Sequence, residues 1–262
     1  MLIRIVFVIL VFIFIVNCSI FPYTSSKVKT LFKNIKNRQK QKLDLNTPPY
    51  IIINIPSYEM FLHNRGKNSK YNIRIGKPSK PTDLGNGIIV QKIVNPVFRY
   101  TIGEQAGEII TKSRIYDTPN GKLLKIIPMP YEKMRSLEPM INGKRNGQMI
   151  HSTTNSETIG FAWSSGCVGL NIDDMLELYP KVNLYTKISV KYEVIKYTPK
   201  TIILYQDIYK LKPDLYSEIK QKIPSQIFSK LDPVKIRKLQ SDYNNSAYQK
   251  TSTVIPLRQL EL

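Results

Sequence analysis

The sequence predicts a mainly β protein, with one domain of ordinary size between a leader and a tail. The 262 residues include 16 tyrosines, and isoleucine and valine cluster in short runs. β-branched and aromatic side chains favour strands, and a chain of this length can bury a sizeable core. Turn residues separate the runs, as in Asn64-Arg65-Gly66-Lys67. Helices are predicted only after Cys167 and near the C-terminus.

Strands are predicted in the first half of the domain wherever these runs lie between turns. They cover Tyr50–Ile55, Tyr58–Leu62, Tyr71–Ile75, Gly87–Ile93 and Lys122–Ile127. Gly76–Thr82 and the segment that starts at Asn95-Pro96 are predicted as loops, and Asp117–Gly121 as a hairpin turn. Pro128–Gly147 has neither a strand nor a helix period, so it is predicted as an irregular cap or lid over a site.

The second half adds one short helix and two strands. Ser164–Leu170 is predicted to lead into a helix with Asn171 as its N-cap. Asp173 and Asp174 then fall in the first turn, where negative charge suits the helix dipole. The late strands are predicted over Lys187–Ile195 and Thr201–Leu204.

The C-terminal extension, residues 193–262, changes to a helical pattern after the last strand. Asp232 and Pro233 predict the N-cap and first position of a second helix. Ser241–Leu262 is polar and is predicted to be a mobile tail. The apolar positions of the two helices are Leu215, Ile219, Ile223, Val234, Ile236 and Leu239.

Residues 1–23 predict an export segment. Arg4 precedes an apolar run of twelve residues, Ile5–Val16, which is short for a spanning helix and suits a signal peptide. Ile15-Val16-Asn17-Cys18 is a loose form of the lipid-attachment motif, so Cys18 is a candidate lipidation site. A cleaved signal, a lipoprotein and an uncleaved anchor all stay open. The expected location is the periplasm or cell envelope.

The formal net charge of +20 is extreme. Residues 24–49 hold a run of lysines and one arginine with no acidic residue before Asp44, and predict a flexible tether that would suit anionic lipid head groups. No zinc-finger, RNP or helix-turn-helix signature occurs, so no specific nucleic-acid partner is expected. A lysine-rich solvated surface is the favoured explanation for the rest of the charge, and an anionic envelope surface would attract it too.

One stretch, Gln148–Tyr179, contains the candidate catalytic residues. It holds His151, one of two histidines, and Cys167, the one cysteine beyond the leader. A lone thiol excludes an intrachain disulfide in the exported domain, and two histidines argue against a His/Cys zinc site. No metal or cofactor is expected. The thiolate is the attacking species in cysteine chemistry and needs a base or a positive neighbour. Cys167 is therefore a candidate nucleophile and His151 its candidate base.

Small residues surround the candidate nucleophile in Ser164-Ser165-Gly166-Cys167. Such a run lets backbone N–H groups crowd around a reacting carbonyl, as an oxyanion hole requires. Ser165, Gly166 and the Cys167 amide are candidate donors, and simple turn formation is the alternative. His63 is expected on a strand surface with no role.

The stretch resembles the catalytic signature of the L,D-transpeptidases of the YkuD type, which cross-link bacterial peptidoglycan. That family has a histidine upstream of Ser/Thr-His-Gly-Cys, followed by a hydrophobic residue and usually Arg or Asn. The resemblance extends from Pro49 to Tyr209. The matching positions are His151, Ser164, Gly166, Cys167, Val168, Ile75-Gly76-Lys77-Pro78, Pro81-Thr82, Lys92, Asn95-Pro96, Asn171, Asp173 and Leu178-Tyr179.

This resemblance implies a β-sandwich catalytic domain over residues 50–192. It implies Cys167 as the nucleophile, His151 as proton donor and acceptor, and Ser152 as the residue whose backbone carbonyl orients the imidazole. Trp163 is expected either to line the groove for a stem peptide or to plug the core. The implied reaction joins two peptidoglycan stem peptides in a 3→3 cross-link through a cysteinyl thioester.

Two positions depart from the family pattern. Ser165 replaces the motif histidine, a form that also occurs in one branch of the family, and this leaves His151 as the base. Gly169 stands where Arg or Asn is usual, at a position that helps to bind substrate. Two alternatives stay open: a carboxypeptidase or other cysteine acyl-hydrolase acting on the same stems, and a catalytically silent envelope-binding module.

Overall fold

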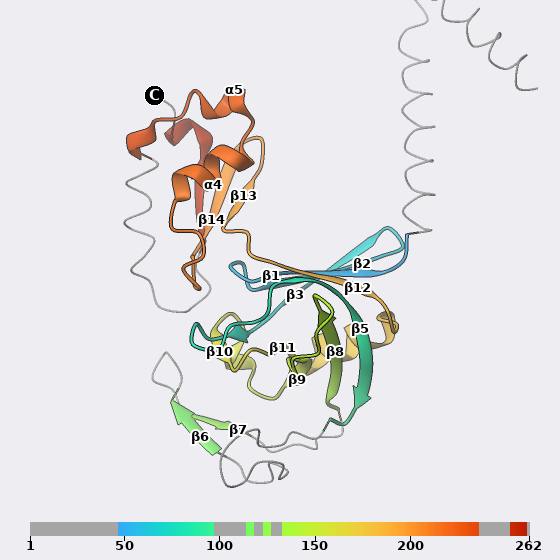
Figure 1. Cartoon of the computed structure of the whole chain (residues 1–262). Helices are drawn as coiled ribbons and strands as arrows, with labels where there is room; N and C mark the ends of the chain where they lie inside the picture. The colour runs from blue at the N-terminus through green and yellow to red at the C-terminus, as the bar shows by residue number, and fades with distance from the viewer. Residues whose placement is uncertain (1–46, 97–113, 118–122, 127–132, 236–251, 261–262) are drawn as a thin grey trace, which may run out of the picture. The chain divides into compact units, whose positions relative to one another are not determined.

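A computed structural model describes residues 47–96, 114–117, 123–126, 133–235 and 252–260 (Figure 1). The predicted export segment, with Cys18, and nearly all of the predicted tether lie outside these residues. Pro48–Leu262 forms a compact unit. Within the described parts, no helix combines the length and the apolar character needed to cross a membrane. The mainly β fold predicted from the sequence is confirmed.

An eight-stranded sheet forms the centre of the fold, in the order β11-β9-β8-β5-β12-β1-β2-β3. β1 pairs with β12 in parallel and with β2 in antiparallel orientation. Alternate residues of β1 point inwards, and Ile51 and Ile53 are fully buried in the main core. The strands of this sheet are β1 (Tyr50–Asn54), β2 (Glu59–Asn64), β3 (Lys67–Asn72), β5 (Gly85–Val94), β8 (Arg135–Ile141), β9 (Ile150–Thr153), β11 (Val168–Asn171) and β12 (Lys187–Lys191).

The predicted strand Tyr71–Ile75 is wrong as a single element. β3 ends at Asn72, and the next strand, β4 (Ile75–Gly76), pairs with β10 (Ala162–Ser164) in a separate two-stranded sheet. Between them, Arg74 forms an isolated antiparallel bridge with Gly169. The chain leaves one sheet and joins another here, a change that residue periodicity does not report.

The predicted irregular lid Pro128–Gly147 is wrong over Arg135–Ile141, whereas the described residues 142–147 lie outside any strand or helix. β8 (Arg135–Ile141) lies inside the main sheet between β5 and β9. Pro139 hides this strand in the sequence, because proline cannot donate to a sheet ladder and favours bulges. It stands opposite Ile89, where the register between β5 and β8 shifts.

A separate hairpin joins β6 (Arg114–Asp117) to β7 (Leu123–Ile126). β7 agrees with the predicted strand Lys122–Ile127, whereas the predicted turn between the two strands lies mostly outside the described residues.

The segment around the candidate nucleophile is more extended than predicted. Ser164–Leu170 does not wind into the helix, because β11 (Val168–Asn171) first pairs in parallel with β9. α3 (Ile172–Leu178) follows with Asn171 at the N-cap position, as the sequence predicts, although the Asn171 side chain makes no capping hydrogen bond. A short 3-10 helix, η2 (Ser156–Thr158), lies between β9 and β10, and another, η3 (Tyr179–Lys181), follows α3.

The C-terminal part has its own small sheet and core. β13 (Ile195–Tyr197), β14 (Thr201–Tyr205) and β15 (Ser252–Pro256) form a three-stranded sheet. Helix α4 (Leu215–Lys222) buries Leu215 and Ile219 in this second core, as its periodicity predicts. Short elements α5 (Ser225–Phe228) and η4 (Leu257–Gln259) complete it.

The prediction of a mobile tail over Ser241–Leu262 is wrong for its last described part. Ile255 of β15 pairs with Ile202 of β14 and is buried, as is Leu257. The second predicted helix begins as expected, since Asp232 Oδ1 accepts a hydrogen bond from the Val234 N–H at 2.8 Å. Its continuation beyond residue 235 lies outside the described residues.

Candidate active site

Two adjacent strands carry the candidate catalytic residues. β9 and β11 run parallel with Gly169 opposite His151, and the Val168 N–H donates to the Met149 carbonyl at 2.8 Å. Cys167 immediately precedes β11, two residues before Gly169. Side chains two residues apart on an extended chain share a face. The backbone therefore places the thiol on the same side of this strand pair as the imidazole.

Cys167 is a free, partly buried cysteine at the end of a tight turn. Its Sγ accepts a hydrogen bond from the Met149 N–H at 3.4 Å. Burial raises the pKa of the Cys167 thiol, while that hydrogen bond and the positive charge of Arg74 act in the opposite direction. The net shift is upward, so the resting thiol is protonated at neutral pH and needs a base to become a nucleophile.

His151 is buried, with 5% of its surface exposed. Its Nδ1 lies 2.7 Å from the carbonyl oxygen of Ser152. Burial, reinforced by the charge of Arg74 and opposed by this hydrogen bond, lowers the pKa of His151 to about 3. The imidazole is therefore neutral at physiological pH. A carbonyl can only accept, so Nδ1 carries the proton and Nε2 is the basic nitrogen of the ring.

Ser152 is held by the neighbouring strand. Its Oγ accepts from the Arg135 N–H at 3.0 Å and donates to the Arg135 carbonyl at 3.3 Å, and the residue is fully buried. β8 therefore fixes the residue whose carbonyl meets His151.

The turn before Cys167 leaves two N–H groups open. Gly166 has a φ of +109°, a conformation that glycine adopts without strain. Its N–H donates to Ser164 Oγ at 3.2 Å, and this hydroxyl in turn donates to the Cys167 carbonyl. Within the described parts of the chain, the N–H groups of Ser165 and Cys167 have no hydrogen-bond acceptor. These two, rather than Gly166, are free to meet an oxyanion.

The remaining predicted residues lie around this turn. Ser165 is exposed, and Trp163 is partly buried on β10, which pairs with β4. His63 lies away from the turn on β2, where its ring stacks on Tyr50 with 4.3 Å between centroids.

Sequence reasoning missed Arg74. Its backbone pairs with Gly169, and its charge acts on both Cys167 and His151. Arg74 lies between two buried isoleucines, a pattern that predicts an outward-facing residue on a strand. The signal that could have found it is the missing side chain at Gly169, which leaves room for another residue's side chain.

The loop from Gly76 to Thr82 is hydrogen-bonded to Tyr209 in the C-terminal part of the chain. Tyr209 OH donates to the Gly76 carbonyl at 2.7 Å and accepts from the Thr82 N–H at 3.1 Å. Gly76 in turn packs on the nucleophile turn, since an added Cβ there would lie 2.9 Å from Gly166 Cα. Tyr209 thus supports the nucleophile turn indirectly, through Gly76.

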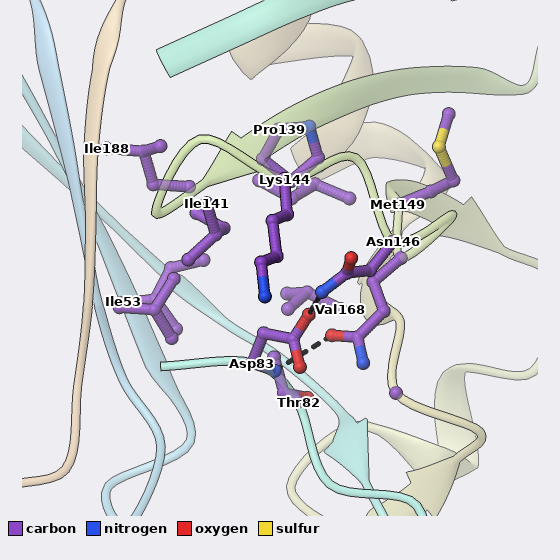
Figure 2. Close-up of a pocket in the computed structure, with 14 residues that line it drawn as sticks. Ile53, Thr82, Asp83, Pro139, Ile141, Lys144, Asn146, Met149, Val168 and Ile188 are labelled. Carbon is purple, nitrogen blue, oxygen red and sulfur yellow. Dashed lines mark hydrogen bonds between the residues drawn. The ribbon is translucent and has the colours of Figure 1, made fainter. Parts of the chain in front are cut away.

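A pocket borders the same turn (Figure 2). Its walls include Val168 and Gly166, the two neighbours of Cys167, and its aliphatic side is formed by residues such as Ile53. Lys144 points into the space in Figure 2, and Asp83 accepts a hydrogen bond from Asn146 Nδ2 at 2.5 Å. The pocket therefore combines apolar walls with one residue of each charge.

Solved structures of L,D-transpeptidases are similar to this chain. One from Mycobacterium smegmatis is 22% identical over 55% of this chain and 58% of its own, with a TM-score of 0.39. L,D-transpeptidase 1 from Mycobacterium tuberculosis is 19% identical over 55% of this chain and 61% of its own, with a TM-score of 0.36. A mutant L,D-transpeptidase from Enterococcus faecium is 19% identical over 55% and 50%, with a TM-score of 0.40. The similar region thus spans less than two thirds of each of these chains.

A comparison with curated protein sequences found no match. The family model for the L,D-transpeptidase catalytic domain, YkuD, matches residues 48–190. This match covers more than half of the chain and contains both β9 and β11, with the histidine and cysteine described above. The chain therefore belongs to the YkuD family of L,D-transpeptidase catalytic domains.

Proposed function

We propose that this protein is a peptidoglycan L,D-transpeptidase that forms 3→3 cross-links between stem peptides through a thioester on Cys167. The observation that carries the proposal is the position of His151, held through Nδ1 by the Ser152 carbonyl on the strand that pairs with the one after Cys167. A protonated thiol next to a neutral, oriented imidazole is the resting state from which a base-assisted attack starts.

In the first half-reaction, Cys167 Sγ attacks the carbonyl carbon of residue 3 of a tetrapeptide donor stem. His151 Nε2 takes the thiol proton as the S–C bond forms. The bond from that carbon to the terminal residue's nitrogen then breaks, and the imidazolium gives its proton to this leaving amine. A lowered imidazolium pKa makes it a strong acid towards that amine.

In the second half-reaction, the side-chain amine of another stem attacks the thioester. His151 takes a proton from the attacking amine, and the thiolate leaves and is reprotonated. The products are one new amide bond and free Cys167, so no net oxidation, reduction or cofactor is required.

The open N–H groups of Ser165 and Cys167 suit the oxyanion that forms in both steps. Donors at fixed positions stabilise developing charge without reorganising during the reaction. The pocket beside the turn suits part of a charged peptide, because Lys144 and Asp83 in its lining offer both signs of charge.

Incubation of the purified full chain with disaccharide-tetrapeptide tests the proposal. Mass spectrometry should find a cross-linked dimer with loss of one terminal residue, and Cys167→Ala should form none. Loss of the terminal residue without dimer would indicate water as the acceptor and a carboxypeptidase. An unchanged substrate together with tight binding to cell walls would indicate a silent binding module.

Export to the cell envelope is part of the same proposal, because the substrate lies there. Arg4 and the apolar run Ile5–Val16 support it. Cell fractionation should find the protein with the envelope. Metabolic palmitate labelling that is lost in Cys18→Ala would establish a lipid anchor, and labelling independent of Cys18 would exclude that site.

A further inference from the structure

Arg74 is fixed against the strand that follows the nucleophile. Its N–H donates to the Gly169 carbonyl at 2.9 Å, and the Gly169 N–H donates back to the Arg74 carbonyl at 3.0 Å. The two residues therefore form a complete antiparallel bridge. Because both hydrogen bonds are made by the backbone, the position of Arg74 does not depend on its side chain.

The Arg74 side chain fills the space above Gly169. A Cβ added to Gly169 would lie 2.7 Å from Arg74 Cγ and 2.9 Å from Cδ, and would also collide with Nε. Real Cβ atoms almost never approach other atoms this closely. A glycine at position 169 is thus a condition for the observed placement of the arginine.

Arg74 is a cation without an anionic partner in the described parts of the chain. Nη1 donates to Thr158 Oγ1 at 3.2 Å, and that hydroxyl donates to the Asn155 carbonyl at 2.7 Å. Nε is buried and has no hydrogen-bond partner among the described residues. Arg74 as a whole is partly buried, but leaving its buried Nε–H without an acceptor costs stability, and such arrangements are found at functional sites.

Two titratable groups face this cation. Cys167 does so from the start of β11 and His151 from β9. Burial lowers the pKa of Arg74 to about 10, which leaves the guanidinium charged at neutral pH. A fixed positive charge favours a thiolate and disfavours an imidazolium in its neighbourhood.

We propose that Arg74 is the fixed cation that stabilises negative charge on Cys167 when its thiol ionises, and that Gly169 is a glycine so that Arg74 can lie there. Arg74 thereby supplies the positive charge that a permanently protonated histidine would otherwise provide. His151 is neutral in the resting protein and can act as the general base and then the general acid. This assignment of a charge-stabilising residue rests on the proposed role of Cys167 as a nucleophile.

The test measures thiol ionisation directly and needs no peptidoglycan. Alkylation of Cys167 by iodoacetamide is measured in the full chain from pH 6 to pH 10. Peptide masses distinguish alkylation of Cys167 from alkylation of Cys18. Arg74→Met should slow alkylation at pH 7.5 by about tenfold or more, since one pKa unit is tenfold in thiolate. Its rate profile should move to higher pH. Arg74→Lys, which keeps the charge, should restore most of the rate.

Arg65→Gln is the matched control, because it removes an exposed arginine in the turn between β2 and β3 and changes the net charge equally. Its profile should coincide with the wild-type profile. A folded Arg74→Met protein with the wild-type profile would overturn the proposal, and so would equal slowing in Arg65→Gln, which would indicate a general charge effect.

Gly169→Ala provides a second test that keeps the arginine. The added methyl group should displace the Arg74 side chain and slow alkylation in the same direction as its removal. In an Arg74→Ala background the same change should have little further effect, because contacting residues do not act additively. Independent, additive effects of the two substitutions would contradict the proposal.

These outcomes are separable from those of the proposed function. A protein that makes no cross-links but shows the Arg74-dependent profile would refute the transpeptidase proposal and keep this one. A protein that makes cross-links but whose alkylation profile does not change in Arg74→Met would support the transpeptidase proposal and refute this one.

Discussion

His151 Nδ1 lies 2.7 Å from the carbonyl oxygen of Ser152, the next residue along the same strand. The contact selects the tautomer with an unprotonated Nε2, because the carbonyl can only accept a hydrogen bond. The Ser152 hydroxyl is bonded to the backbone of Arg135 at the start of β8. The orientation of the imidazole is thus set by the sheet and does not depend on a flexible side chain.

The first prediction concerns the proton-transfer role of this histidine. His151→Asn keeps a side-chain N–H that can donate to the Ser152 carbonyl but removes the titratable nitrogen. Cross-linking of natural stems at pH 7 should fall by about 10²–10⁴-fold, the usual loss for a general acid–base. Rates are measured by mass spectrometry of the dimer. His63→Asn, which removes the other histidine, should retain wild-type activity. Wild-type cross-linking in His151→Asn would place the base elsewhere.

The second prediction concerns a reactive substitute for the stem peptide. A carbapenem should acylate Cys167, and intact mass should rise by one drug molecule. Cys167→Ser should show no rise, whereas Cys18→Ser should react like the wild type. In His151→Asn the strained ring should still react, faster as the pH rises. Because burial raises the pKa of Cys167, the acylation rate of His151→Asn should recover only at a pH above the pKa of an ordinary free thiol. A mass shift retained in Cys167→Ser would identify another reactive group.

Local patterns in the sequence were sufficient for much of the fold. The turn at Arg65-Gly66 has both residues at positive φ, and the short loop fixes the pairing of β2 with β3. The N-cap at Asn171 and the buried face of α4 also follow from residues close in sequence. The nucleophile and base were predicted from residue type and spacing alone. Strands β9 and β11, which position His151 and Cys167, were not predicted.

The failures involve pairings between distant residues. β8 buries Glu138, a residue that predicts a surface loop, and the structure allows this because Arg145 Nε donates to the Glu138 carboxylate at 2.8 Å. β15 is short and mostly exposed, and its buried residue Ile255 pairs with Ile202, which is far away in sequence. Arg74 was missed for the same reason, since no local pattern relates it to the strand after Cys167.

The third prediction tests the support from the C-terminal part. Tyr209→Phe removes one hydroxyl that bonds to both Gly76 and Thr82, two buried residues of the loop beside the nucleophile turn. A buried polar group left without a partner costs about 1–3 kcal/mol. Urea denaturation should show a loss in this range, and cross-linking should also fall because Gly76 packs on Gly166.

Tyr185→Phe is the matched control for this substitution, because Tyr185 is 72% exposed. It should change neither stability nor turnover. Full turnover in a destabilised Tyr209→Phe protein would show that the hydroxyl supports the fold without affecting the active site.

The fourth prediction follows from the lowered pKa of His151. An unfolded chain takes up a proton on this histidine near pH 6.5, whereas the folded protein does so only near pH 3. Between these values the unfolded state binds more protons, so acid shifts the equilibrium towards unfolding. The stabilising contribution is thus fully present above about pH 6.5 and is lost as the pH falls towards about 3.

The free energy of unfolding should therefore fall less steeply with acid in His151→Asn than in the wild type. Urea denaturation at several pH values between 7 and 4 measures both slopes, with His63→Asn as the control for loss of a histidine. The carboxylates titrate in all three proteins, so the difference between slopes isolates His151. Equal slopes in His151→Asn and the wild type would mean that the buried imidazole accepts a proton in the folded state as readily as in the unfolded chain.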